Sequence, residues 1–284
     1  KAMVFMGEEL EKNSNGTLKL EVYPNQQLGS ERQCLELLQI GSLDMTKVSA
    51  AVMENFSPNM KVLGLPFLFK NKEQTFNILD GEIGKELLDG GKKYWLKGLG
   101  YYDAGSRSFY TKEAPILKPK NLEGLKIRVM ESVTAMNMVR NLGGSPTPIS
   151  AGELYTALQQ GVVDGAENNP PTFYLSRHYE VCKFFSLDEH TTIPDVLIMS
   201  THLWDKLSEK EQVWVQKAVD SSVKYQRKLW AKAETEAIEA VKKAGVTVVI
   251  PDKSEFQEKM VSLYDDYKSN KEIYELITKI KAFQ

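Results

Sequence analysis

The segment from Gly124 to Pro171 constrains the fold more strongly than any other part of the 284-residue chain. Apolar and charged residues alternate at its start, as in a half-buried strand, and two helical patterns follow, ended by Gly143 and Gly161. The predicted order is strand, helix, rigid bend, helix and short strand, at residues 125–129, 134–142, 146–148, 150–160 and 162–163. Strands alternating with helices form an open α/β sheet, and ligands bind at the rim where such strands end. The segment therefore predicts an α/β fold with Arg128 and Asn168 on that rim.

A weak internal repeat indicates two similar α/β lobes. Residues 38–44 and 158–164 align at a constant offset of 120 residues, with four identities in seven positions. In both copies a helix ends at a glycine and a short strand ends at an aspartate. A capping box at 208–211 then begins a helical pattern that continues to Ala244. At ~1.5 Å per residue this helix spans roughly 54 Å, so we expect it to run across both lobes.

The remaining elements follow from the same periodicities. Helices are predicted at 2–11 and 29–40, with two short ones near the C-terminus, and strands at 17–23, 43–48, 99–110, 184–187, 195–200 and 246–250.

Composition and motifs exclude several classes of function. The net charge of −2 gives no electrostatic footprint for nucleic acid, and no apolar run approaches the ~18 residues of a transmembrane helix. The sequence has no dinucleotide fingerprint, P-loop or nucleophile elbow, and its three histidines lack metal-ligand spacing, so we expect neither cofactor nor metal. Residues 188–190 are interpreted as a solvated turn, and Cys34 and Cys182 as unpaired thiols. The chain starts at Lys1 without an initiator methionine, as a mature or trimmed product does.

Arginine is scarce in this chain, which makes its positions informative. Only six of the 36 basic residues are arginines, and Arg107 and Arg128 are the two at predicted strand ends. A guanidinium binds a carboxylate through two parallel hydrogen bonds, which an ammonium cannot reproduce. We therefore predict that both arginines bind a ligand carboxylate, with an interdomain salt bridge as the alternative.

Other polar residues are predicted at the same rim. Asn168 follows Glu167 in a turn, where each side chain either contacts a ligand or caps local backbone. Lys47 lies near the end of a predicted strand, Ser49 and Glu131 lie just past predicted strands, and each of the three is a candidate contact for a ligand hydroxyl.

Ordered motifs along nearly the whole chain resemble those of the solute-binding proteins of TRAP (tripartite ATP-independent periplasmic) transporters. The motifs are Gly124-Leu-Lys-Ile-Arg-Val129, 143–148, 153–159, 161–165 and Glu167-Asn168, with 23–24, 27–29 and 66–69 in the first half. The resemblance implies a two-lobed periplasmic-binding-protein-like fold (type II-like) with a hinge and a long helix across both lobes. We expect lobe I to comprise 1–105 plus 194–233, and lobe II 106–193 plus 234–284. The family's first strand, with a loop that touches ligand, would precede the first helix of this chain.

The resemblance also implies a function. Such proteins bind an organic acid outside the cytoplasm, in the periplasm and with or without a lipid anchor, and deliver it to a membrane permease. Arg128 matches the family's signature arginine for the ligand carboxylate, and Arg107 and Asn168 match further ligand-binding positions. Strand register places Ser49 and Glu131 at pocket positions as well. We expect a monomer without enzymatic activity.

The identity of the acid is narrowed by a few positions. Sialate-binding relatives carry an aromatic residue where this chain has Ala151, which argues against sialate. Residues 103–110, 128–132 and 167–171 look most like the branch that binds hexuronates such as D-glucuronate or D-galacturonate. Another sugar acid or a C4-dicarboxylate is an alternative ligand, and an enzyme acting on a sugar acid is an alternative of a different class.

Overall fold

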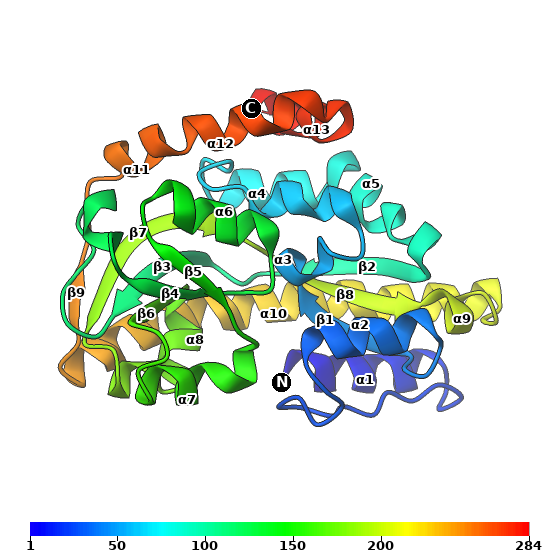
Figure 1. Cartoon of the computed structure of the whole chain (residues 1–284). Coiled ribbons are helices and arrows are strands. Elements are labelled where there is room, and N and C mark those ends of the chain that lie inside the picture. The colour runs from blue at the N-terminus through cyan, green and yellow to red at the C-terminus, as the bar shows by residue number, and fades with distance from the viewer. Residues whose placement is uncertain (284) are drawn as a thin grey trace.

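The computed structural model describes residues 1–283, and they form two α/β lobes that lie side by side (Figure 1). Lobe I is built around a three-stranded sheet of order β1-β8-β2. Lobe II is built around a six-stranded sheet of order β5-β4-β6-β3-β7-β9, at the left of Figure 1. This architecture confirms the predicted fold class.

The described chain contains the following strands and helices. The strands are β1 (Met45–Ser49), β2 (Leu96–Tyr102), β3 (Ser106–Thr111), β4 (Lys126–Val129), β5 (Ser145–Pro148), β6 (Gly165–Asn168), β7 (Phe184–Thr192), β8 (Asp195–Ser200) and β9 (Thr247–Val249). The helices are α1 (Ala2–Asn13), α2 (Glu31–Gln39), α3 (Ala50–Met53), α4 (Lys72–Asp80), α5 (Glu82–Gly90), α6 (Val133–Asn141), α7 (Leu154–Gln159), α8 (Pro170–Leu175), α9 (Thr201–Trp204), α10 (Glu209–Lys243), α11 (Ser254–Lys259), α12 (Val261–Asp266) and α13 (Lys271–Ala282).

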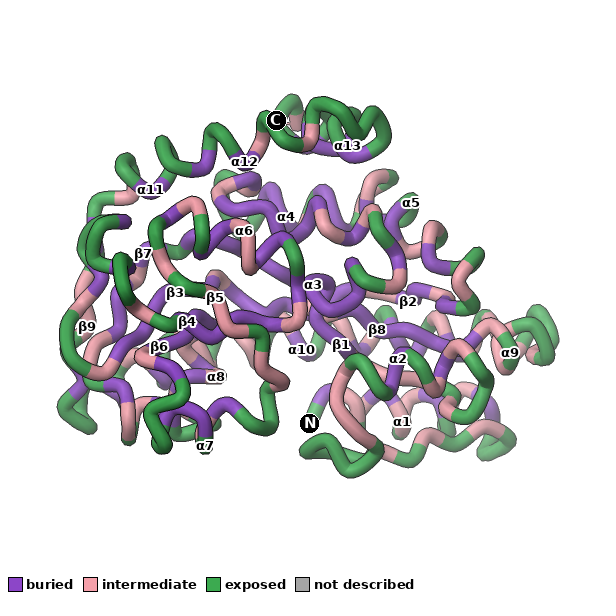
Figure 2. Tube along the Cα trace, viewed as in Figure 1, coloured by how far each residue is buried: buried purple, intermediate pink, exposed green. Residues whose placement is uncertain are grey.

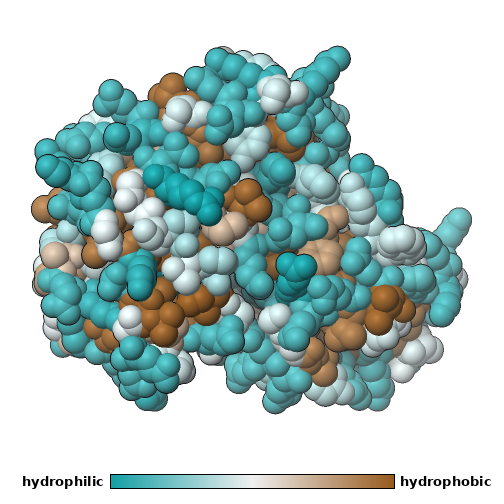
Figure 3. Space-filling model, in the orientation of Figure 1, coloured by the Kyte–Doolittle hydropathy of each residue, from teal (hydrophilic) through white to brown (hydrophobic). Residues whose placement is uncertain are grey.

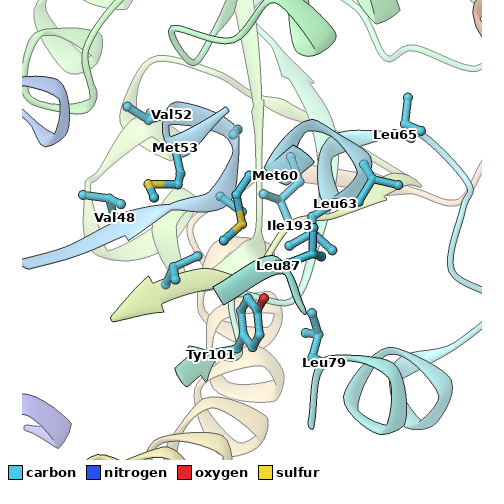
Figure 4. Packing of buried hydrophobic residues seen from close by; sticks show 14 of the residues in the cluster. Val48, Val52, Met53, Met60, Leu63, Leu65, Leu79, Leu87, Tyr101 and Ile193 are labelled. Carbon is cyan, nitrogen blue, oxygen red and sulfur yellow. The ribbon is translucent and has the colours of Figure 1, made fainter. Parts of the chain in front are cut away.

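The core of lobe I lies around the antiparallel pairs that β8 makes with β1 and β2. Val48, Met60, Leu63 and Tyr101 belong to its buried cluster, and Figure 4 shows their side chains converging. The C-terminal helix α13 adds four buried apolar side chains to this same cluster: Ile273, Leu276, Ile277 and Ile280.

The sheet of lobe II is covered on both faces. Phe109 and Tyr110 are neighbours on β3 and therefore point to opposite faces. Phe109 packs with Ile127, Met138 and residues of α11 and α12, whereas Tyr110 packs with residues of α7, α8 and the end of α10. Figure 2 shows the strands buried between helices whose outer sides are exposed. The face of the molecule drawn in Figure 3 is largely hydrophilic, with apolar patches between polar side chains.

Three segments cross between the lobes near the middle of the molecule. The β2–β3 connection at 103–105 and the β7–β8 connection at 193–194 contain the two boundaries predicted between the sheets. The 35-residue helix α10 runs behind both sheets (Figure 1), and Gln226 of this helix bonds the backbone N and O of Asp103 at 2.9 and 2.8 Å. The exact division of the chain into lobes stays a prediction, and the packing of α13 on lobe I departs from the predicted placement of 234–284.

The internal repeat corresponds to equivalent helix ends in both lobes, but the strand of each copy begins just after the aspartate, at Met45 and Gly165, and does not end there as predicted. Gly41 and Gly161 end α2 and α7 in the left-handed conformation, with φ of 74° and 75°. In each case the two residues after the helix donate to carbonyls of its last turn, which is the standard glycine-ended helix cap. The capping box of Ser208 and Glu211 at the start of α10 is present as predicted.

Several predicted elements were wrong in detail, including the short strand at 162–163, which lies before β6. Residues 17–23 form no strand, and 99–110 divides into β2 and β3 because the chain bends at Gly105, whose φ is +62°. The predicted bend at 146–148 is part of β5, where proline is tolerated because this strand lies at the sheet edge. Three helices close the described chain in place of two. None of the described helices combines the length and apolar character needed to cross a membrane.

Candidate functional site

A cavity of about 290 Å³ lies between the two lobes. All six predicted site residues line it: Lys47 and Ser49 from lobe I, and Arg107, Arg128, Glu131 and Asn168 from lobe II. Three larger hollows have volumes of about 950, 820 and 670 Å³, and the one of 820 Å³ adjoins this cavity because both are lined by Glu31 and Lys47. We assign the candidate site to the smallest of the four because both buried arginines line it.

Arg128 is the most unusual residue of the cavity. It lies on β4, parallel to the neighbouring β6, and only 2% of the residue is exposed. Its Nε donates to the carbonyl of Ile149 at 2.8 Å, and no carboxylate within residues 1–283 pairs with its guanidinium. Burial, reinforced by the nearby charge of Arg107, lowers the pKa of Arg128. The fold therefore holds a desolvated cation whose terminal nitrogens face a cavity.

The guanidinium of Arg107, by contrast, forms hydrogen bonds with other groups of the protein. It lies on β3, and its Nε and Nη2 donate to the two carboxylate oxygens of Glu167 at 2.5 and 2.8 Å. Its Nη2 also donates to the backbone carbonyl of Glu167 at 2.7 Å, and Nη1 to Oδ1 of Asn168 at 2.8 Å. A guanidinium has five donors, so four of them are occupied. The predicted alternative of a salt bridge thus describes Arg107 in part, although both partners lie within lobe II.

The Arg107–Glu167 pair belongs to a longer row of buried charged side chains. His190 lies 3.5 Å from Glu167 through Nε2 and 2.7 Å from Asp188 through Nδ1. Burial alone would lower the pKa of His190, but the carboxylates of Asp188 and Glu167 raise it to about 9. Burial alone would raise the pKa of Glu167, but Arg107 and His190 lower it to about 2. Asp188 and His190 are fully buried in β7, so the interpretation of 188–190 as a solvated turn was wrong.

The lobe I wall carries a second charged group that the sequence did not reveal. Lys47 Nζ lies 2.6 Å from Oδ2 of Asp195 and 4.0 Å from Oε1 of Glu31. The same Glu31 oxygen accepts from the backbone N of Ser49 at 3.2 Å. Glu31 and Asp195 are the first residues of α2 and β8. Because both residues lie at the ends of predicted elements on the predicted rim, the sequence could have indicated them as site residues.

The remaining predicted residues have mixed roles. Ser49 caps α3 through a 3.4 Å bond from the backbone N of Ala51 and also lines the cavity. Asn168 accepts from the backbone N of Asn169 and from Arg107, which leaves its amide NH₂ without a partner in the described chain. Glu131 is half-buried at the cavity, and its backbone carbonyl accepts from Asn55 of lobe I at 2.6 Å.

Comparison with known proteins decides the family. The family model described as bacterial extracellular solute-binding protein, family 7 (DctP), matches residues 1–270. The chain belongs to this family. This assignment confirms the resemblance to TRAP solute-binding proteins and their two-lobed fold.

Individual solute-binding proteins are similar over nearly the whole chain. The YiiZ protein of Salmonella typhimurium is 39% identical over 283 residues, which are 99% of this chain and 86% of the relative. A TRAP periplasmic solute-binding protein from Xanthobacter autotrophicus, solved with bound β-D-galacturonate, has a TM-score of 0.97 and 42% identity, covering 100% of this chain and 95% of that one. A second, from Chromohalobacter salexigens with bound D-glucuronate, has a TM-score of 0.97 and 35% identity over the same shares. As a TRAP solute-binding protein, the chain serves transport.

Proposed function

We propose that this TRAP solute-binding protein binds a hexuronate, such as D-glucuronate or D-galacturonate, and delivers it to the membrane permease from the periplasm. The observation that carries the proposal is Arg128, a buried guanidinium that opens into a cavity and pairs with no carboxylate of the described chain. Burying an unpaired cation is costly, and a ligand carboxylate would remove that cost on binding. Two relatives with TM-scores of 0.97 hold galacturonate and glucuronate, which supports a hexuronate as the acid.

The polar residues around Arg128 suit the rest of a sugar acid. In our proposal Arg128 forms the two-point pair with the carboxylate, and Arg107 holds Asn168 so that its amide donates to the ligand. Lys47, Ser49 and Glu131 also line the cavity, and in the same proposal they bond ring hydroxyls of the ligand. The volume of about 290 Å³ is at the small end of ligand pockets, as a single sugar acid requires.

The same residues support binding over turnover. Acid–base catalysis needs a group whose pKa lies near the working pH. The pKa of Glu167 is held at about 2, and four hydrogen bonds tie this residue to Arg107 and His190. We therefore propose that the protein carries the acid to the permease, in preference to an enzyme that acts on it. We propose that it does so as a monomer.

The experiment is a thermal shift against sugar acids, dicarboxylates and keto acids. A ligand that binds only the folded state stabilises it by RT ln(1 + [L]/Kd), about 2.7 kcal/mol at a hundredfold excess over Kd. We expect D-glucuronate or D-galacturonate to raise the melting temperature most. A shift with succinate or pyruvate and none with the uronates would refute the assignment.

A further inference from the structure

The cavity is electrically asymmetric. Glu167 neutralises Arg107, whereas Arg128 of the same cavity pairs with no carboxylate of the described residues. Three carboxylates also line the cavity, from Glu31, Glu131 and Asp195. Lys47 is the one cation of the described chain within 4.0 Å of Glu31 and Asp195, and it lies closer to Asp195. The lobe I wall formed by Glu31, Lys47 and Asp195 therefore sets two carboxyl groups against one ammonium group, and burial raises the pKa of Glu31 while the charge of Lys47 opposes that rise.

In each carboxylate of this wall, one oxygen accepts no hydrogen bond from the described residues. Lys47 and the Ser49 backbone N engage Oδ2 of Asp195 and Oε1 of Glu31. Among residues 1–283, nothing donates to Oδ1 of Asp195 or Oε2 of Glu31, and neither oxygen is sealed from solvent. The side chains of Glu31 and Asp195 are 27% and 21% exposed. An ionised carboxylate only accepts hydrogen bonds, so the complementary ligand group is a hydroxyl.

We propose that Glu31 and Asp195, bridged by Lys47, determine specificity by accepting hydroxyls of the bound acid and by rejecting a second carboxylate. This inference rests on the proposed function and adds to it the charge class of the ligand. One carboxylate of the ligand pairs with Arg128. A second carboxylate, at the other end of a six-carbon chain, would face the carboxylates of lobe I without a donor and with like charge. The site therefore takes polyhydroxy acids with one carboxylate and excludes the matching diacids.

The geometry of the wall favours this role over a purely structural one. Asp195 and Ser49 are paired residues at the ends of β8 and β1, and Glu31 begins α2, so three element ends converge on the cavity. Lys47 holds Asp195 at a fixed position, and the Ser49 backbone holds Glu31. Acceptors held in this way discriminate between hydroxyl and carboxylate because they cannot turn away from an incorrect ligand.

The test compares acids that differ at one carbon, using calorimetry on the full chain. The pairs are D-galacturonate with galactarate, and D-gluconate with D-glucarate. For the wild type we expect the monoacid to bind roughly 100-fold tighter than its diacid. In Glu31→Gln and Asp195→Asn, the monoacid should weaken roughly tenfold while the diacid gains, so the ratio should fall at least tenfold. Glu36→Gln, an exposed position on α2 outside the cavity, should leave both affinities unchanged.

The outcomes separate this inference from the proposed function. A wild type that binds a diacid as tightly as its monoacid, or a ratio unchanged in both variants, overturns the inference. A chain that binds gluconate but no uronate overturns the hexuronate assignment, and the gluconate–glucarate ratio then decides the inference by the same criterion. Binding of none of the four acids, together with no thermal shift from D-glucuronate, overturns both. If Asp195→Asn does not fold, Glu31→Gln decides alone, because Glu31 lies 4.0 Å from Lys47 and forms no close ion pair.

Discussion

Arg107 donates two hydrogen bonds to the carboxylate of Glu167, at 2.5 and 2.8 Å, inside a sheet where both residues are almost fully buried. This ion pair distinguishes Arg107 from Arg128, although the sequence analysis predicted the same role for both. Arg107 has its counter-ion within lobe II, whereas Arg128 has none among residues 1–283. The predictions below follow from that difference.

Arg128→Lys should weaken binding of the hexuronate by about 2–5 kcal/mol, because lysine keeps the charge but loses the two-point geometry. The free energy of unfolding without ligand should change little, since no protein carboxylate of the described chain depends on this side chain. Calorimetry and urea unfolding on one variant measure both quantities. Arg140→Lys, on the exposed side of α6, is the matched control. A destabilised apo protein with near-normal affinity would contradict the ligand role.

Glu167→Gln should lower the free energy of unfolding by about 3 kcal/mol or more, because it leaves Arg107 buried without a counter-ion. His190 would lose a carboxylate neighbour in the same step. Urea unfolding at neutral pH measures the effect, and Glu113→Gln at an exposed position is the control. A loss below about 1 kcal/mol would show that the buried pair contributes little to stability.

Stability should fall as the pH rises from neutral to alkaline. The pKa of His190 is raised to about 9 in the folded protein, so its ionised form stabilises fully below the unfolded pKa near 6.5. This contribution, roughly 3 kcal/mol, is lost as the pH rises through about 9. Urea unfolding between pH 6.5 and 9.5 should show the decline. His190→Asn should flatten it, and an equal slope in this variant would assign the decline to other groups.

Ligand binding should draw the lobes together, because the cavity residues come from both of them. Small-angle scattering should give a smaller radius of gyration with a saturating uronate than without it. An unchanged radius, with binding established by calorimetry, would mean that the site is rigid.

Gly161→Ala should cost about 1–2 kcal/mol of folding free energy through backbone strain alone, since φ is +75° and nothing lies within 4 Å of the added methyl. Gly41→Ala should cost more, because its Cβ would meet His202 at 3.1 Å. Gly90→Ala, at a helical position with open space and without positive φ, should have almost no cost. Thermal unfolding ranks the three variants.

The sequence predicted those elements whose boundaries are set by residues close to them along the chain. The alternation before Arg128, the glycines that end α2 and α7, and the capping box of Ser208 all act within a few residues of the chain. The six residues predicted for the site all line one cavity in the structure. The ligand roles of those residues stay predictions, which the variants above test.

What escaped prediction depends on contacts between distant segments. Nothing local shows that Glu167 lies against Arg107, 60 residues away, or that Lys47 meets Asp195 across 148 residues. Residues 188–190 have the composition of a turn, and only the partners supplied by β3 and β6 make that segment a buried strand. Residues 17–23 alternate as a strand does, but no described strand pairs with them.

The placement of α13 has a consequence for the order of folding. The core of lobe I includes Leu35 near the start of the chain and Ile280 near its end. The two clusters of lobe II draw on residues between Phe109 and Leu263. During synthesis, therefore, lobe II can complete its core while lobe I still lacks its last helix. A chain stopped before residue 270 would leave an apolar groove on lobe I, and such a species is a natural target for a chaperone or a protease.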